Sequence, residues 1–193
     1  MLKNINCPLT ELQTSYVIGR NEEEMATKVI YELKTESIEL HRLERAMEKT
    51  IMEQPALNSY IHNSKLLMMK ETINPVHVPF TDISSYAEDE KERHINNVLN
   101  ELKRNVWDCK EGYPVTVSAV KMDENDIRIF LDFDMLIFDG MSTKLFLDKI
   151  KHYYDDPHAI PQVDHSFFDY CLSKTKLQKS KGYERAKKLL AQR

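Results

Sequence analysis

Residues 134–142 read Asp-Met-Leu-Ile-Phe-Asp-Gly-Met-Ser, and this stretch decides more about the fold than any other. An alternating apolar segment, residues 127–133, precedes it, and apolar residues recur at helical spacing over residues 141–154. These patterns predict a strand and a helix joined by a turn. The turn carries two carboxylates, Asp134 and Asp139, and ends in a serine. Two rigid elements can hold such groups in the fixed geometry that a catalytic or channel-lining site requires.

Two interpretations of Asp139 stay open at this point. An Asp-Gly pair ahead of an apolar-periodic run is also how an ordinary helix begins. As the N-cap, Asp139 would accept the backbone N–H groups of Met141 and Ser142, which contributes about 1 kcal/mol. Asp134 is harder to explain in this way, because it ends a strand and shares a face with Asp132.

Composition excludes several classes of function. A length of 193 residues supports one core of respectable size or two small ones. A content of 41% hydrophobic and 30% charged residues is ordinary for a soluble globular protein. The net charge of −4 gives no reason to expect nucleic acid. With 4 glycines, the chain has no Gly-rich phosphate loop, and its 7 histidines lack metal-site spacing.

The cysteines and the apolar runs indicate a cellular compartment. The chain has 3 widely spaced cysteines, and we find no secretory segment at its start. This pattern favours reduced thiols. No apolar run approaches the length of a membrane span. We therefore expect a cytoplasmic protein.

The rest of the chain predicts alternating helices and strands. A helix begins at Thr10, with Gln13 completing a capping box, and ends at Gly19. The other expected elements are a strand over 26–35, a helix over 38–53, a hairpin of 57–61 and 65–69, an edge segment or loop over 76–83, a helix over 87–106, a hairpin of 114–122 and 126–133, and a helical region over 167–193. This order predicts an α/β fold of α+β layers, with helices packed on a largely antiparallel mixed sheet.

A Pro-marked linker over residues 157–163 suggests how the chain is organised. We expect a lobe over residues 1–156, followed by a linker and a weakly apolar helical tail over residues 157–193. A tail with so weak an apolar stripe is typical of a segment that packs on a partner surface.

The motifs follow in order those of a known family. Ordinary condensation domains of nonribosomal peptide synthetases carry His-His-x-x-x-Asp-Gly at this turn, and heterocyclization domains carry Asp-x-x-x-x-Asp-x-x-Ser. Asp134, Asp139 and Ser142 fit the second pattern. Residues 8–20 resemble the opening motif Leu-Thr-x-x-Gln-x-x-Tyr-x-x-Gly-Arg. The chain thus resembles the N-terminal lobe of a heterocyclization domain, which implies a chloramphenicol acetyltransferase-like half-domain.

This resemblance implies roles for the residues of the turn. Asp134 would be the polar or proton-handling group at the substrate tunnel. Asp139 would organise the turn, with Arg20 as the partner of a buried ion pair. Ser142 would cap the helix or face the tunnel.

Three further residues would line that tunnel. Gln13 and Tyr16 of the opening motif would face the substrate. Met135 occupies the position of the second histidine of ordinary condensation domains, and a thioether cannot act as a base.

The family reaction implies partners and no cofactor held by the chain itself. An acyl group on one carrier protein is joined to a cysteinyl, seryl or threonyl thioester on another, and loss of water then gives a thiazoline or oxazoline. The 4′-phosphopantetheine would be carried by peptidyl or aryl carrier proteins. The other expected partners are a second condensation-type lobe or other synthetase subunits, with neither nucleic acid nor membrane.

Two departures from the family pattern leave the activity open. The family's Arg-His-Pro-x-Leu-Arg corresponds to residues 53–58, Glu-Gln-Pro-Ala-Leu-Asn, which lack both basic positions. The second lobe, which carries the Asp and Thr credited with cyclodehydration, would follow this chain. We therefore expect either an enzyme lobe that needs a second lobe or a truncated, non-catalytic module that docks carrier proteins or synthetases. A small trimeric acetyltransferase fits less well, because His165 lacks the His-x-x-x-Asp-Gly context.

Overall fold

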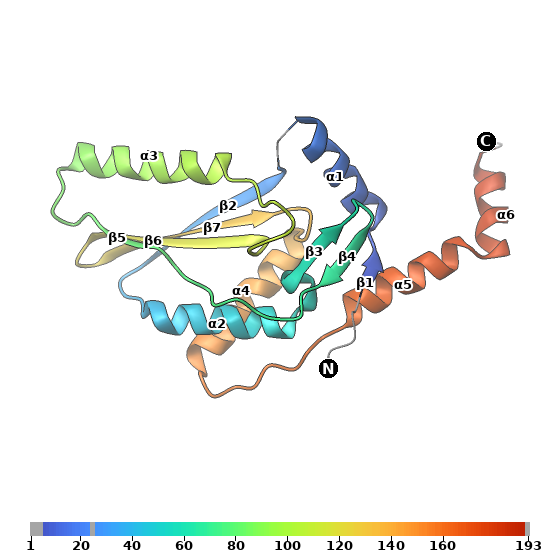
Figure 1. Ribbon diagram of the computed structural model, residues 1–193. Coiled ribbons are helices and arrows are strands. Elements are labelled where there is room, and N and C mark those ends of the chain that lie inside the picture. Colours follow the sequence, from blue (N-terminus) through green and yellow to red (C-terminus); the bar gives the residue numbers. More distant parts are fainter. Residues whose placement is uncertain (1–5, 24–25, 192–193) are drawn as a thin grey trace.

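The computed structural model describes residues 6–23 and 26–191 and shows helices packed on both faces of a sheet (Figure 1). The elements in chain order are β1 (Asn6–Pro8), α1 (Glu11–Glu23), β2 (Lys28–Thr35), α2 (Leu40–Glu53), the 3₁₀ helix η1 (Pro55–Asn58), β3 (Ser59–His62), β4 (Leu66–Met69), β5 (Phe80–Asp82), α3 (Glu88–Arg104), β6 (Val115–Asp123), β7 (Asp126–Asp134), α4 (Gly140–Asp155), α5 (Ser166–Gln178) and α6 (Lys181–Leu190).

The larger sheet has four strands in the order β2-β7-β6-β5. β7 pairs antiparallel with both β2 and β6, and the short edge strand β5 runs parallel to β6. Helix α3 covers one face, while α2 and α4 cover the other (Figure 1). The predicted α/β layers and the largely antiparallel mixed sheet are confirmed.

Alternating side chains on β6 and β7 supply a core on each face of this sheet. On the side of α2 and α4, Phe133, Phe138 and Phe146 meet edge to face, with ring centroids 4.9–5.5 Å apart. On the side of α3, the buried residues are Ile83, Ile95, Val120, Met122 and Phe130. The alternation of side chains along β7 is the pattern by which the strand was recognised in the sequence.

A smaller antiparallel sheet, β1-β4-β3, lies beside the larger one (Figure 1). Its central hairpin turns at Asn63 and Ser64, whose φ angles are 50° and 55°. Strand β1 escaped the sequence analysis, yet Cys7 in it is fully buried. Helix α5 covers this sheet through Phe168 and Cys171, so the C-terminal segment packs on the N-terminal strand.

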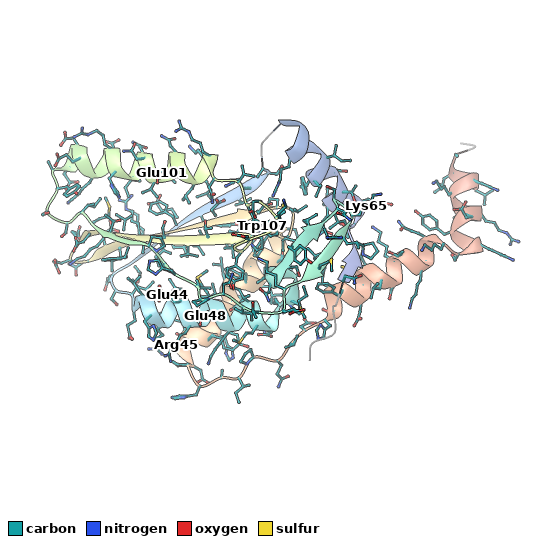
Figure 2. The ribbon with its side chains drawn as sticks, viewed as in Figure 1. Glu44, Arg45, Glu48, Lys65, Glu101 and Trp107 are labelled. Atoms are coloured by element: carbon teal, nitrogen blue, oxygen red, sulfur yellow. The ribbon has the colours of Figure 1, made fainter. Side chains whose placement is uncertain are left out.

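The glutamates of α2 fix the segment that leads into the edge strand. Glu44 accepts the backbone N–H of Val78 at 2.9 Å, and Glu48 accepts that of Val76 at 3.0 Å. Both glutamates are marked on α2 in Figure 2. The segment over residues 76–83, expected as an edge segment or loop, is a loop as far as residue 79 and then forms the edge strand β5.

Two predicted helix boundaries were wrong. Helix α1 continues past Gly19 to Glu23. A glycine ends a helix by adopting a positive φ, and among the glycines that the structure describes only Gly112 does so. Gly19 therefore does not end the helix. The tail, expected as one helical region, forms two helices, because the Ser180 hydroxyl accepts the backbone N–H of Tyr183 at 3.2 Å and starts α6.

In the described ranges, no helix is both long and apolar enough to cross a membrane. The proposed division of the chain at residue 156 stays a prediction.

Candidate functional site

Asp134 closes β7 and is held there by an arginine from α1. The α1 capping box forms as expected, since Gln13 N–H binds the Thr10 hydroxyl and the Gln13 side chain accepts Thr10 N–H. This directs α1 across the end of β7, where Arg20 Nη2 lies 2.7 and 2.6 Å from the two carboxylate oxygens of Asp134. Arg20 Nη1 also donates to the carbonyl of Trp107 at 2.8 Å. The side chains of Arg20 and Asp134 are only 11% and 5% exposed.

The expected ion pair between Arg20 and Asp139 was therefore wrong. Arg20 binds Asp134, because α1 crosses the strand end and not the start of α4. Asp139 is exposed and starts α4 as its N-cap.

Asp139 and Ser142 form a reciprocal capping box. Asp139 Oδ1 accepts the backbone N–H of Ser142 at 2.8 Å, and the Ser142 hydroxyl accepts the backbone N–H of Asp139 at 2.6 Å. The Ser142 backbone N–H and hydroxyl hold the pKa of the Asp139 carboxyl below its ordinary value. The helix-start interpretation accounts for the geometry of Asp139 in full.

Asp132 forms a second buried ion pair on the same face of β7. Lys28 Nζ lies 2.7 Å from Asp132 Oδ2 and donates to the carbonyls of Leu102 and Asn105 at the C-terminal end of α3. Burial raises the pKa of Asp132 against the opposing effect of Lys28, and the nearby Asp134 carboxylate raises it further. Asp132 Oδ1 is buried and has no hydrogen-bond partner among the residues that the structure describes. Sequence showed that the two aspartates share a face, but nothing in it pointed to Lys28.

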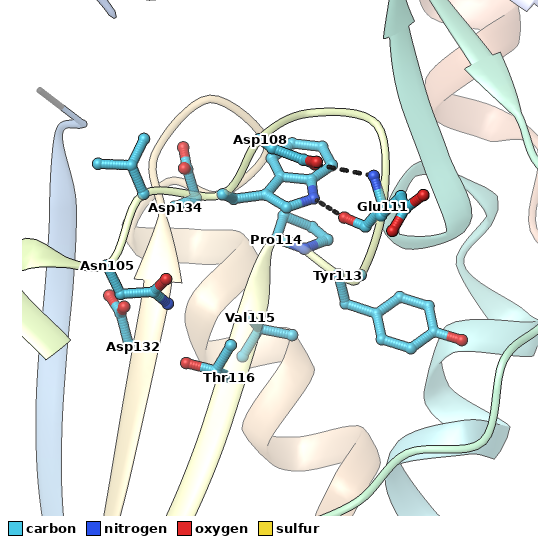
Figure 3. A pocket seen from close by; sticks show the side chains of 12 residues that line it. Asn105, Asp108, Glu111, Tyr113, Pro114, Val115, Thr116, Asp132 and Asp134 are labelled. Atoms are coloured by element: carbon cyan, nitrogen blue, oxygen red, sulfur yellow. Dashed lines mark hydrogen bonds between the residues drawn. The ribbon is translucent and has the colours of Figure 1, made fainter. Parts of the chain in front are cut away.

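A cavity of about 300 Å³ opens beside these two aspartates. Figure 3 shows it between the strand ends of the sheet and the loop that follows α3. Its lining residues are Asn105, Val106, Trp107, Asp108, Glu111, Gly112, Tyr113, Pro114, Val115, Thr116, Asp132 and Asp134. We call this the strand-end cavity. The loop carries no sequence motif that would have placed it here.

The three motif residues do not converge on one cavity. Asp134 lines the strand-end cavity, whereas Ser142 lines a separate cavity of about 470 Å³ between α2, α4 and the start of α5. Asp139 lines neither of them.

The residues expected to line a tunnel lie on different sides of the turn. Gln13 is buried, and its Nε2 donates to the carbonyl of Leu136 at 3.1 Å. Tyr16 is half-buried in the cluster around Trp107 and Leu136. Met135 is half-buried against the core beneath α2 and α4. The structure thus brings Gln13 and Tyr16 to the turn and directs Met135 to the core.

Known proteins give independent evidence of ancestry. The chain is 22% identical over 183 residues to bacitracin synthase 1 of Bacillus licheniformis, which covers 92% of this chain and 4% of that protein. It is also 22% identical over 131 residues to the hybrid PKS-NRPS synthetase apdA of Emericella nidulans, covering 67% of this chain and 3% of that protein. The chain therefore spans less than a twentieth of the length of these curated relatives.

Solved structures show the same fold. The cyclization-docking bidomain of the EpoB NRPS from Sorangium cellulosum superposes with a TM-score of 0.86 at 20% identity, covering 98% of this chain and 39% of that one. The starter condensation domain of the rhizomide synthetase RzmA superposes with a TM-score of 0.76 at 14% identity, covering 91% and 46%. A model of the condensation domain matches residues 4–189, so the chain belongs to the condensation-domain family.

Proposed function

We propose that this chain is the substrate-facing lobe of a condensation-type domain that acts on carrier-bound thioesters, and that the domain is of the heterocyclizing kind. The observation that carries the proposal is the turn after β7, where Asp134 is clamped by Arg20 and Asp139 pairs with Ser142. This geometry accounts for both aspartates and the serine of the heterocyclization pattern. The likeness in fold to the EpoB cyclization-docking bidomain supports it.

The chemistry would proceed in two steps on the carrier-bound substrates. The amine of the acceptor attacks the donor thioester carbonyl, a C–N bond forms, and the thiol of the donor carrier leaves with the proton. The acceptor thiol or hydroxyl then attacks the new amide carbonyl and closes a five-membered ring, and the resulting hydroxyl leaves as water with the ring N–H proton to give a thiazoline or oxazoline. Each step requires the transfer of a proton and the stabilisation of negative charge on the carbonyl oxygen.

The chain's own residues would position these groups. Asp134 uses both carboxylate oxygens to bind Arg20, so its role here is to fix the strand end. Gln13 holds the carbonyl of Leu136 and thereby the following turn. Peptidyl or aryl carrier proteins would deliver the substrates on 4′-phosphopantetheine, and a second condensation-type lobe or another synthetase subunit would supply the remaining groups.

A second candidate is a non-catalytic module that docks carrier proteins or synthetases. The occupied oxygens of Asp134 favour it, and so does the placement of Met135 against the core. A lobe of this kind would bind a loaded carrier protein without converting its substrate.

Mass spectrometry of carrier-bound products tests both candidates. An acyl carrier and a cysteinyl carrier are incubated with this chain, with and without the remaining condensation-type segment supplied as a separate polypeptide. We expect the acyl-cysteinyl amide and then a product lighter by one water, only when both polypeptides are present. An amide that never loses water would reject the heterocyclizing subtype. No product together with measurable carrier binding would favour the docking module.

Ser142 supplies a variant of the motif that leaves the buried ion pairs intact. Ser142→Ala should reduce the yield of the dehydrated product, whereas Asp148→Asn, on the exposed surface of the same helix, should not. Equal yields of the dehydrated product from both variants would show that Ser142 has no role in heterocyclization.

A further inference from the structure

Two of the three cysteines of the chain meet where helix α5 packs on strand β1 (Figure 1). Cys7 lies in β1 and Cys171 in α5, and the two residues are 0% and 2% exposed. Both belong to one buried cluster with Leu67 and Phe168, and the Cys7 thiol hydrogen-bonds to that of Cys171. Two thiols in direct contact need only small side-chain rotations to reach the geometry of a disulfide.

The two thiols differ in how readily they ionise. The hydrogen bond from Cys7 lowers the pKa of the Cys171 thiol against the opposing effect of burial, and the nearby Lys174 ammonium lowers it further. The same hydrogen bond, together with burial, raises the pKa of Cys7. Cys171 therefore ionises first, while Cys7 keeps its proton. Because the thiolate is the reactive form of cysteine, Cys171 is the thiol that meets an oxidant first.

A small oxidant has a path to Cys171. This residue lines a cavity of about 30 Å³ together with Lys174, Thr175 and the residues that follow β1. A cavity of this volume holds a molecule of the size of water, and hydrogen peroxide is little larger. Helix α5, which the structure describes in full, buries only Phe168 and Cys171 among its 13 residues. A helix held by so few buried side chains opens locally, and each opening exposes the thiol pair.

Cys109 provides a contrast within the same chain. It lies in a different buried cluster, with Val17, Trp107 and Leu136, so neither of the other two thiols is beside it. Burial raises its pKa. Its sulfur accepts a hydrogen bond from Arg20 Nη1 at 2.8 Å and donates one to the Trp107 carbonyl at 3.6 Å. We therefore expect Cys109 to remain a thiol when the other two cysteines are oxidised.

We propose that Cys7 and Cys171 form a reversible disulfide that links β1 to α5 in response to hydrogen peroxide. The Cys171 thiolate attacks one peroxide oxygen, the O–O bond breaks, and the hydroxide that leaves takes up a proton to become water. This step gives a sulfenic acid. The Cys7 sulfur then attacks the Cys171 sulfur, the S–O bond breaks, and the released hydroxide leaves as a second water with the Cys7 proton. Two thiols are oxidised and one peroxide is reduced to two waters.

The disulfide holds α5 on β1 and suppresses the local opening of this helix. A reducing thiol reverses it by exchange, so the link follows the redox state of the surroundings and is not a permanent crosslink. The proposal does not depend on the proposed function, since it involves neither a carrier protein nor the turn after β7.

Mass spectrometry of the oxidised chain tests the link directly. The folded chain is treated with hydrogen peroxide, and the thiols that remain are then blocked with N-ethylmaleimide in denaturant without reductant. We expect blocking at Cys109 alone, together with a proteolytic peptide pair in which Cys7 and Cys171 are joined and two hydrogens are lost. Dithiothreitol before blocking should restore N-ethylmaleimide adducts at all three cysteines.

Thermal unfolding of variants separates the link from a general effect of oxidation. Because the disulfide closes a long loop, peroxide should raise the Tm of the unaltered chain and of the control Cys109→Ala by about 5–10 °C, each relative to its own reduced form. In Cys7→Ala and Cys171→Ala this rise should be absent. Lys174→Gln should slow disulfide formation, whereas Lys176→Gln, on the exposed side of the same helix, should not.

Several outcomes would overturn the proposal. N-ethylmaleimide adducts on both Cys7 and Cys171 after peroxide treatment would show that the pair does not close. A sulfinic acid at Cys171 without a disulfide would show that Cys7 cannot reach it. A linked pair that includes Cys109 would show that the thiols meet only in unfolded chains. Equal rates of disulfide formation in Lys174→Gln and Lys176→Gln would contradict the activation of Cys171 by Lys174.

Discussion

At the end of β7, Arg20 and Asp134 are buried together, and each satisfies the other's charge. Removing one partner leaves the other charged and buried, which costs far more than the pair contributes. Asp134→Ala should therefore lower the free energy of unfolding by about 3–5 kcal/mol. Urea denaturation followed by circular dichroism measures the change.

A matched control separates burial from charge in this prediction. Asp148 pairs with Lys144 at 2.5 Å on the solvent-facing side of α4, with side chains 60% and 70% exposed. Because solvent screens such a pair, Asp148→Ala should cost at most about 0.5 kcal/mol. The double variant Arg20→Met/Asp134→Leu should cost less than Asp134→Ala. If Asp134→Ala lowered the free energy of unfolding no more than Asp148→Ala does, burial of the Arg20–Asp134 pair would not matter for stability.

Asp139 gives a prediction that depends on pH. Its folded-state pKa lies below its ordinary value of 3.8, so its charge-dependent contribution is present above that pH and is lost as the pH falls through the folded-state pKa. At neutral pH, Asp139→Ala should cost about 1 kcal/mol, while Asp139→Asn, also a good N-cap, should cost only a few tenths. The difference between the unaltered chain and Asp139→Asn should vanish in acid.

Thermal unfolding at a series of pH values checks this. A difference that persisted, or grew, below the folded-state pKa would contradict the capping role of the charge. If Asp139→Ala lowered the free energy of unfolding as much as Asp134→Ala does, Asp139 would have to be part of a buried ion pair.

Among the elements, the β3–β4 hairpin turns through two residues that both adopt positive φ. Asn63 tolerates this conformation, but Ser64 at a φ of 55° is strained. Ser64→Gly should therefore raise the free energy of unfolding by about 1 kcal/mol. Lys65→Gly, one residue further on, relieves no positive φ and should lower it by about 0.5–1 kcal/mol. Equal effects of the two glycines in chemical denaturation would rule out strain at Ser64.

Sequence identified those elements whose periodicity is complete. Helix α3 and the β6–β7 hairpin appear within two residues of their expected bounds, because each buries a regular stripe or face. Strand β1 has three residues and too short a pattern to recognise. The end of α1 was misplaced because Gly19 looks like a helix stop in sequence, and only its conformation shows that it is not one.

Across the whole molecule, the smaller sheet and the C-terminal segment share a core separate from that of the larger sheet. Phe168 is 1% exposed and packs with Cys7 and Leu67. Phe168→Ala should therefore increase amide hydrogen exchange in α5 and β1 while leaving β7 protected. The control Tyr170→Ala, at a side chain that is 56% exposed on the same helix, should leave exchange in α5 unchanged. Equal loss of protection in β7 would show that the two cores unfold as one unit.

The sequence by itself determined the order of the longer elements, the layered fold class and the family signature, since periodicity, capping residues and motif spacing are local properties of the chain. Only the tertiary structure decided which charges meet. Arg20 and Asp134 are separated by 114 positions, and Lys28 and Asp132 by 104. Local pattern says nothing of pairs so distant, because their meeting depends on how α1 crosses the strand ends and how the loop after α3 closes over them. The turn at residues 134–142 was visible in the sequence, but the buried pairing of Asp132 with Lys28 beside it was not.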